Sequence, residues 1–339
     1  MPPRDYTTPT LDPVEDITRR RLLTALPALG LIAGGISCGD DDESTPTSAP
    51  AEASLFPRTI AHSAGETTVP ARPERVVALK DFNDLDYLLT LGVEPVAYGF
   101  TNAWESGSMP WQSAASEIQT FDASGEVDLE AVAATNPDLI VTMPVGEDVY
   151  AQLGEIAPTI VLDWGTPWRE GLRWVAAGLG EERAEEAIDG VASRLDAMRE
   201  ALDETTREKK LMVGFMYGDT LYVWGTKVQA MVVFSEMGLN AVSGPEPELA
   251  SLSLEQANVL EQAEILLSVA SDPEAIATQE ASPLFRQLPA VQSGGYDVLP
   301  VAESRALGDG FSPLSIEWVQ GRIVERLNRL AAGRGKQLT

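Results

Sequence analysis

Cysteine and histidine, two residue types that often serve as catalytic groups and metal ligands, are scarce in this chain. Its 339 residues include one cysteine, Cys38, and one histidine, His62. An intrachain disulfide and a thiolate zinc cage are therefore excluded, and a Ser/His/Asp or Cys/His nucleophile would have to use His62. His62 falls near an expected first strand, far from any candidate nucleophile. We predict that His62 is a surface or strand residue, and we predict no metal site.

Sequence signals of common enzyme classes are also missing. The chain has no phosphate-binding loop, no dinucleotide fingerprint and no His-Glu-x-x-His. Neighbouring carboxylates such as Glu181 and Glu182, or Glu185 and Glu186, fall on the expected exposed face of a helix, which is typical of a solvated surface rather than of a glycosidase pair. Catalysis would need carboxylates that face each other across a cleft, so we predict that the protein is not an enzyme.

Ligand binding is the chemistry that the remaining side chains favour. Aromatic rings in loops after predicted strands can stack on a flat, aromatic or macrocyclic ligand. Arg and Lys can pair with the oxygen donors of an anionic chelate, and Arg305 is the strongest such candidate, although Lys80 could instead balance Asp81. The predicted ligand-binding residues are Lys80, Phe82, Phe100, Trp104, Met143, Trp164, Trp168, Tyr217, Trp224, Lys227, Arg305 and Phe311.

Alternating strands and helices must position these residues. Apolar runs and helical spacing predict a first set of elements, with strands at 75–79, 93–100, 138–142 and 160–162 and helices at 84–91, 129–134 and 150–156. A second set has strands at 210–216, 220–224, 265–269 and 296–301 and helices at 228–237, 254–260 and 312–332. Such alternation predicts mainly parallel sheets with helices on both faces.

A long helix is expected between the two sets. Apolar residues recur every three or four positions between Glu182 and Lys210, which indicates one amphipathic helix. The predicted fold class is therefore α/β, with two Rossmann-like lobes joined by one long helix and a ligand cleft between the lobes, since open α/β sheets bind ligands beyond the carboxyl ends of their strands. The predicted boundaries are 58–177 for the first lobe, 178–208 for the linking helix and 209–334 for the second lobe.

The first 38 residues have the pattern of an export leader. A charged region with Arg19 and Arg20 precedes an apolar run that ends at Ile36, which is shorter than the roughly 20 residues of a spanning helix. The paired arginines resemble a twin-arginine export signal. The segment around Cys38 resembles a lipoprotein processing site, although Gly35 stands where leucine is usual. We expect lipidation of Cys38, a flexible linker at 39–57, and a cell-surface or periplasmic lipoprotein on the outer face of the cytoplasmic membrane.

The formal net charge of −28 restricts the partners. The leader contributes nothing to it, because its four acids are matched by four bases. A surface this negative repels phosphate backbones and anionic lipid headgroups, so we expect no nucleic acid and no membrane contact except through the lipid on Cys38. The acids serve solubility or face a basic partner, and charge alone does not separate these two.

Several segments taken together are similar to one known family. They are 69–79, 91–96, 127–132, 136–141 and 252–256, and in this order they resemble the ferric-siderophore and cobalamin-type substrate-binding proteins of ABC importers over residues 58–334. The resemblance implies an exported monomer without a cofactor that captures a ferric siderophore and delivers it to a permease. Cobalamin or haem is the alternative ligand. A surface interaction module without a small ligand is disfavoured by the aromatic loops.

The resemblance also implies how the permease is recognised. In this family an acidic residue on each lobe docks on arginines of the permease, and the matching positions are Glu130 and Glu255. Each lies early in a predicted short helix, after a leucine. A carboxylate in a first helical turn is also favoured by the helix dipole, by about 0.3 to 1 kcal/mol, so both roles are compatible.

Overall fold

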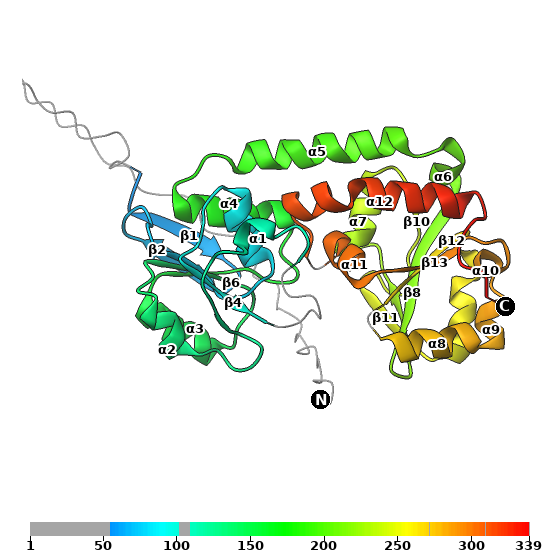
Figure 1. The fold of residues 1–339 in the computed structure, drawn as a ribbon, viewed down its shortest axis with the longest axis horizontal. Helices are drawn as coiled ribbons and strands as arrows, with labels where there is room; N and C mark the ends of the chain where they lie inside the picture. Colours follow the sequence, from blue (N-terminus) through cyan, green and yellow to red (C-terminus); the bar gives the residue numbers. More distant parts are fainter. Residues whose placement is uncertain (1–54, 102–108, 271, 309, 339) are drawn as a thin grey trace, which may run out of the picture. The chain divides into compact units, whose positions relative to one another are not determined.

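The computed structural model describes residues 55–101, 109–270, 272–308 and 310–338 (Figure 1). Within this part the chain forms two lobes, each built on its own β-sheet, and the predicted α/β fold class is confirmed. Four of the predicted site residues, Arg19, Arg20, Cys38 and Trp104, lie outside the described residues.

The first lobe has a five-stranded sheet in which every neighbouring pair is parallel, with the order β5-β4-β3-β6-β7. Its strands are β3 (Val76–Ala78), β4 (Ala97–Phe100), β5 (Thr120–Asp122), β6 (Leu139–Thr142) and β7 (Thr159–Val161). Three of them, β3, β6 and β7, are buried along their length, which explains their continuous apolar sequences. Because the strands are parallel, the segments that follow Ala78, Phe100 and Val161 begin at one edge of the sheet.

Helices cover both faces of this sheet. They are α1 (Asn83–Thr90), α2 (Leu129–Ala134), α3 (Glu147–Ile156) and α4 (Trp168–Leu179). Side chains alternate along β6: Leu139 and Val141 join the cluster that contains α1 and α4, whereas Ile140 joins the cluster under α2 and α3. The sequence did not predict β5 or α4.

A small antiparallel hairpin, β1 (Arg58–His62) with β2 (Gly65–Val69), precedes this sheet. His62 ends β1 and is buried, with its Nε2 2.9 Å from Thr67 Oγ1. Burial lowers the pKa of His62, which favours the neutral imidazole. Of the two positions predicted for His62, the strand is therefore the one that the structure shows, and the surface is not.

The second lobe has a mixed, six-stranded sheet, in which most of the strand pairs are parallel, as expected. The order is β11-β9-β8-β12-β13, and β10 pairs with β8. The strands β10, β8, β12 and β13 are joined by parallel pairs, but β9 is antiparallel to β8 and β11. The strands are β8 (Lys210–Tyr217), β9 (Thr220–Trp224), β10 (Asn240–Ala241), β11 (Leu249–Leu252), β12 (Ile265–Val269) and β13 (Tyr296–Leu299).

Helices again surround this sheet. They are α7 (Gln229–Glu236), the 3-10 helix η3 (Leu254–Gln262), α8 (Pro273–Ala281), α9 (Pro283–Arg286), α10 (Pro289–Gln292), α11 (Val301–Leu307) and α12 (Pro313–Ala331). The helix predicted at 254–260 is present as the 3-10 helix η3. The last two helices matter most for the site, since α11 follows the final strand directly and α12 runs alongside the linking helix in the same direction (Figure 1).

The connection between the lobes is shorter than the predicted helix over 182–210. It consists of α5 (Ala184–Ala201) and a separate short helix α6 (Glu204–Glu208), because Leu202 is extended. Asn328 of α12 holds the break through its Oδ1, which accepts from the backbone N–H of Asp203 at 3.0 Å and from Thr206 Oγ1 at 2.8 Å. No helix among the described residues is long and apolar enough to cross a membrane.

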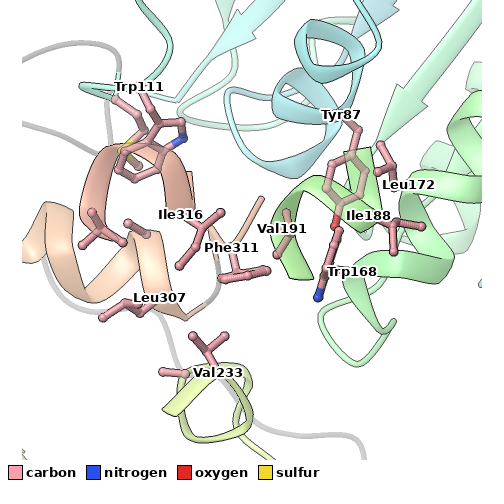
Figure 2. Close-up of a cluster of buried hydrophobic side chains, with 14 of the residues drawn as sticks. Tyr87, Trp111, Trp168, Leu172, Ile188, Val191, Val233, Leu307, Phe311 and Ile316 are labelled. Carbon is pink, nitrogen blue, oxygen red and sulfur yellow. The ribbon is translucent and has the colours of Figure 1, made fainter. Parts of the chain in front are cut away.

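A hydrophobic cluster joins residues of both lobes (Figure 2). Trp168 of α4 and Phe311, just before α12, are 3% and 1% exposed, and their ring centroids lie 5.4 Å apart. The ring centroids of Trp111, in the first lobe, and Trp318, in α12, are also 5.4 Å apart. The lobes therefore share an apolar seam, which we define by Trp111 and Trp168 on one side and Phe311 and Trp318 on the other.

Candidate functional site

A cavity of about 370 Å³ lies in the second lobe. Strand residues, the N-cap residue of α7, and α11 with its C-cap residue line the cavity. The lining residues are Phe215, Trp224, Val228, Leu249, Val269, Val301, Ser304, Arg305 and Gly308. Phe215 and Trp224 meet edge to face with centroids 6.1 Å apart. The lining is apolar apart from Ser304 and Arg305, and an apolar pocket with a few polar groups is the usual form of a small-molecule site.

Arg305 connects this cavity to the first lobe. It lies in the last turn of α11, and its guanidinium carbon is 5.8 Å from the centroid of the Phe82 ring, at the start of α1. The Phe82 ring in turn meets Trp164 edge to face at 5.7 Å, and Trp164 is 54% exposed. We define the candidate site as the cavity together with Phe82 and Trp164. It presents one guanidinium and several rings, which suits a ligand that has both apolar rings and polar oxygens.

Ion pairs fix the position of α11. Arg326 of α12 binds both carboxylate oxygens of Glu303, with Nε–Oε2 and Nη2–Oε1 distances of 3.2 Å. Arg326 and Arg329 also bind Asp297 of β13. Because Glu303 is two residues before Arg305 and is only 7% exposed, this network holds the helix that presents Arg305.

Three buried carboxylates surround the start of α1. Asp84 accepts from the backbone N–H groups of Lys80, at 2.8 Å, and Phe82, at 3.2 Å, and burial raises its pKa to about 7 although the charge of Lys80 opposes the shift. Asp81 accepts from Thr101 Oγ1 at 2.6 Å, while its Oδ2 is buried without a hydrogen-bond partner. Burial raises the pKa of Asp81 too, against its hydrogen bonds and the charge of Arg305. Burial thus favours the neutral, protonated form of both carboxyl groups.

The third carboxylate, Asp86, fastens the two lobes. It is 1% exposed and accepts 2.7 Å hydrogen bonds from Trp111 Nε1, Gln112 Nε2 and Ser312 Oγ, and Ser312 is the N-cap of α12. Burial raises the pKa of Asp86 to about 6, and the three donors limit this rise. Asp86 therefore ties α1 to α12 beside the seam.

Four of the predicted ligand-binding residues come together in the candidate site: Phe82, Trp164, Trp224 and Arg305. Phe100 lines a different hollow, with Phe121 and Asp122, at the carboxyl ends of β4 and β5. Tyr217 is exposed at the β8–β9 turn, Lys80 is half-buried before α1, and Lys227 is exposed and pairs with Glu248 at 2.8 Å.

Three other predicted positions are in the hydrophobic core. Met143, Trp168 and Phe311 are 2%, 3% and 1% exposed. Trp168 and Phe311 are buried because they pack on each other across the seam (Figure 2). Met143 belongs to the same hydrophobic cluster. They have almost no surface to offer a ligand, so packing explains these three residues better than the predicted cleft position.

Sequence reasoning missed Phe215, Ser304 and Asp86. Phe215 lies inside β8, one position before its buried neighbour Met216, and strand alternation places these two side chains on opposite faces. Ser304 precedes Arg305 on the same short helix, which the sequence did not predict. An aspartate between buried leucines, as Asp86 is between Leu85 and Leu88, was the available signal of a satisfied buried carboxylate.

Glu130 and Glu255 occupy equivalent local positions in the two lobes. Each is exposed and is the second residue of its helix, α2 or η3. The capping hydrogen bonds are made by other residues: Asp128 accepts from the N–H of Ala131 at 2.9 Å, and Ser253 forms a capping box with Gln256. Helix capping therefore does not occupy the carboxylates of Glu130 and Glu255.

Comparison with known proteins gives consistent relatives. The chain is 26% identical over 256 residues to the ferric-anguibactin-binding protein FatB of Vibrio anguillarum, which covers 70% of this chain and 78% of FatB. It is 27% identical over 267 residues to the ferric enterobactin-binding periplasmic protein FepB of Escherichia coli, covering 71% and 83%. The crystal structure of PiaA from Streptococcus pneumoniae in complex with ferrichrome has the same fold, with a TM-score of 0.68 at 21% identity, over 81% of this chain and 99% of that one.

The family comparison agrees with these relatives. A model of the periplasmic binding protein family matches residues 76–296, which include β3, α5 and most of the second lobe up to the start of β13. This match covers well over half of the chain and confirms the family resemblance noted in the sequence. The chain therefore belongs to the periplasmic binding protein family.

Proposed function

We propose that this protein captures a ferric siderophore in the candidate site and delivers it to the permease of an ABC importer. The observation that carries the proposal is the continuous series Trp164, Phe82, Arg305 and Trp224, which extends from the first lobe into the 370 Å³ cavity. Rings and a guanidinium are the groups that recognise the organic shell and oxygen donors of such a chelate. The names of FatB and FepB support the same ligand class.

The remaining parts of the proposal concern the partners and the location. Glu130 and Glu255 dock on basic residues of the permease, and the protein acts as a monomer without a cofactor and without catalysis. Residues 1–38 are a twin-arginine-type leader with Arg19 and Arg20, and Cys38 is lipidated. Residues 39–57 are a flexible linker between the lipid and the folded part. The two lobes are 58–177 and 209–334, and the linking helix is 178–208. Both glutamates are exposed, and neither makes the capping hydrogen bonds of its helix, which supports the docking role.

The test is calorimetric and fluorescence titration of the chain carrying Cys38→Ser. The ligands are ferric hydroxamate, catecholate and citrate complexes, metal-free chelators, haem and cobalamin. We expect saturable binding of at least one iron complex and none of its metal-free chelator. If only haem or cobalamin binds, the ligand class is the alternative one. If none of the ligands binds, the assigned site is refuted.

Two variants connect binding to the site. Arg305→Gln should weaken the affinity about 10-fold or more, since one charge-assisted hydrogen bond is worth about 1.5 to 3 kcal/mol. Arg334→Gln is the matched control, because Arg334 is an exposed arginine of the C-terminal segment away from the cavity. Equal affinities for these two variants would exclude Arg305 from the site.

A further inference from the structure

One face of the second lobe's sheet continues outward from the cavity. Strand pairing places Trp224 of β9 opposite Leu249 of β11, and Phe215 of β8 opposite Tyr222 of β9. Because side chains alternate along a strand, every second residue from these positions lies on the same face. We call this surface the aromatic face. Its residues are Phe215, Tyr217, Thr220, Tyr222, Trp224, Leu249 and Ser251.

The opposite face of these strands is covered, whereas the aromatic face is open. Leu221 and Val223 of β9 are buried in a hydrophobic cluster that includes residues of η3. On the aromatic face, Tyr217 and Leu249 are 44% and 45% exposed, and the other residues are exposed or half-buried. With Trp164 of the candidate site, these two are three of the five exposed large apolar side chains among the described residues. Exposed apolar surface that gathers in one place is typical of a binding surface.

The rings of the aromatic face form a continuous series that starts in the cavity. Phe215 and Trp224 line the cavity and meet edge to face, with ring centroids 6.1 Å apart. Tyr222 lies outside the cavity lining and stacks on Phe215, with centroids 5.8 Å apart and 26° between the ring planes. Tyr217 follows at the end of β8. The series therefore extends the candidate site by two rings that the cavity itself does not include.

A flat aromatic group fits this surface better than an alkyl chain does. No residue of the aromatic face is charged, so the group that it suits is a neutral one. An open face does not surround an alkyl chain, which gains only from the area that it buries. A planar ring lays its face or its edge against neighbouring rings, and it gains from the contact between rings in addition to burial.

We propose that the aromatic face is a subsite for an aryl group of the ligand, so that the protein prefers ferric siderophores that carry an aromatic ring over ring-free ones. This inference rests on the proposed siderophore-binding function and adds the chemical class of the ligand. Arg305 keeps its role of binding the oxygen donors, while the aryl group stacks on Tyr222 and Tyr217. Phe215 belongs both to the cavity and to the aromatic face, so a ligand held in the cavity reaches this face directly.

The test is titration calorimetry of the chain carrying Cys38→Ser with matched ferric complexes. Two of them are hexadentate trishydroxamates on one backbone, with equal charge, that differ only in the terminal acyl group, which is benzoyl or acetyl. A tris-catecholate, which contains rings, and ferric citrate, which does not, complete the set. We expect the benzoyl complex to bind at least about 10-fold more tightly than the acetyl complex, because the phenyl ring gains both burial and ring contacts.

Variants connect this preference to the aromatic face. Tyr222→Leu should remove most of the preference, since leucine is apolar but offers no ring, whereas Tyr222→Phe keeps the ring and should preserve it. Tyr150→Leu is the matched control, because Tyr150 is a half-buried tyrosine of α3 in the first lobe, beside His62. It should leave the ratio of affinities unchanged. If Tyr222→Leu does not fold, the exposed Tyr217 still decides, and Tyr217→Ala should reduce the preference about 3-fold.

The outcomes separate the aryl subsite from the proposed function. Ring-free complexes that bind as tightly as the aryl ones, or a preference that persists in Tyr222→Leu, would overturn the subsite and leave the proposed function intact. If Tyr222→Leu changes the sedimentation mass and not the ratio of affinities, the face pairs two copies of the chain and the subsite is overturned. Failure of all the iron complexes to bind would overturn the proposed function itself.

Discussion

Replacing Arg326 by leucine tests whether the ion-pair network behind α11 supports both the fold and the site. The Arg326 side chain is 17% exposed and binds both oxygens of Glu303, whose side chain is 9% exposed, as well as Asp297. Asp297 keeps Arg329 as a partner in the variant. Glu303 would lose this arginine and remain as a largely buried carboxylate.

The expected magnitude follows from that geometry. Removing one partner of a buried, hydrogen-bonded pair costs about 3 to 5 kcal/mol, because the other charge stays buried and uncompensated. We therefore expect Arg326→Leu to lower the free energy of unfolding by about 3 kcal/mol. This value is at the low end of that range because the Arg326–Glu303 pair keeps some contact with water. The double variant Arg326→Leu with Glu303→Leu should recover most of this loss, since replacing both charges by apolar groups is often nearly neutral.

Urea unfolding at pH 7 measures these differences, and the chelate affinity is measured on the same samples. Arg322→Leu is the matched control on α12, an exposed arginine over the Trp318 ring at 4.9 Å, and it should cost no more than about 1 kcal/mol. A loss below about 1 kcal/mol for Arg326→Leu, or a double variant less stable than the single one, would refute the reasoning.

Two further predictions concern stability. The raised pKa of Asp86, about 6, means that the folded state binds the proton more tightly than the unfolded state, so the contribution of Asp86 to stability falls as pH rises from about 4 to about 6. The unfolding free energy of the native sequence minus that of Asp86→Asn should therefore drop by about 2 kcal/mol between pH 4 and pH 7 in denaturant titrations, and a constant difference would contradict the assignment. In the same denaturant titrations, Gly99→Ala should lower the free energy of unfolding by at least about 3 kcal/mol, because the new Cβ would lie 2.0 Å from the Leu79 carbonyl oxygen. Gly154→Ala on α3 is the matched control: its Cβ would meet no atom within 4 Å, so it should raise the free energy of unfolding by up to about 1 kcal/mol.

Local sequence patterns were sufficient for most of the elements. The bounds of α2, β9 and β12 match the predicted ranges at 129–134, 220–224 and 265–269, because each is a short apolar or alternating run with clear ends. The break in the linking helix was not predictable, since Leu202 continues the apolar spacing of α5. Its cause, Asn328, is far away in the sequence and meets the break only in the folded chain.

The candidate site was predictable in part for a similar reason. Position after a strand identified Phe82, Trp164 and Arg305, which the structure brings together. The same rule also selected Trp168 and Phe311, whose burial depends on packing between the lobes. The position of a residue after a strand does not show which of these contacts it makes. A ring that faces a ligand and a ring that packs on the other lobe therefore have the same pattern in the sequence.

The contribution of α12 to the first lobe has a consequence for the order of biosynthesis. Ser312 completes the hydrogen bonding of Asp86, and Phe311 and Trp318 cover Trp168 and Trp111, yet these three residues are synthesised after every strand of the second lobe's sheet. A nascent first lobe thus emerges with two tryptophans uncovered and a carboxylate missing one donor, and contacts of such long sequence separation form late. Final consolidation of the first lobe therefore waits until α12 has been synthesised, and a chain stopped before Phe311 would display this apolar surface to chaperones and proteases.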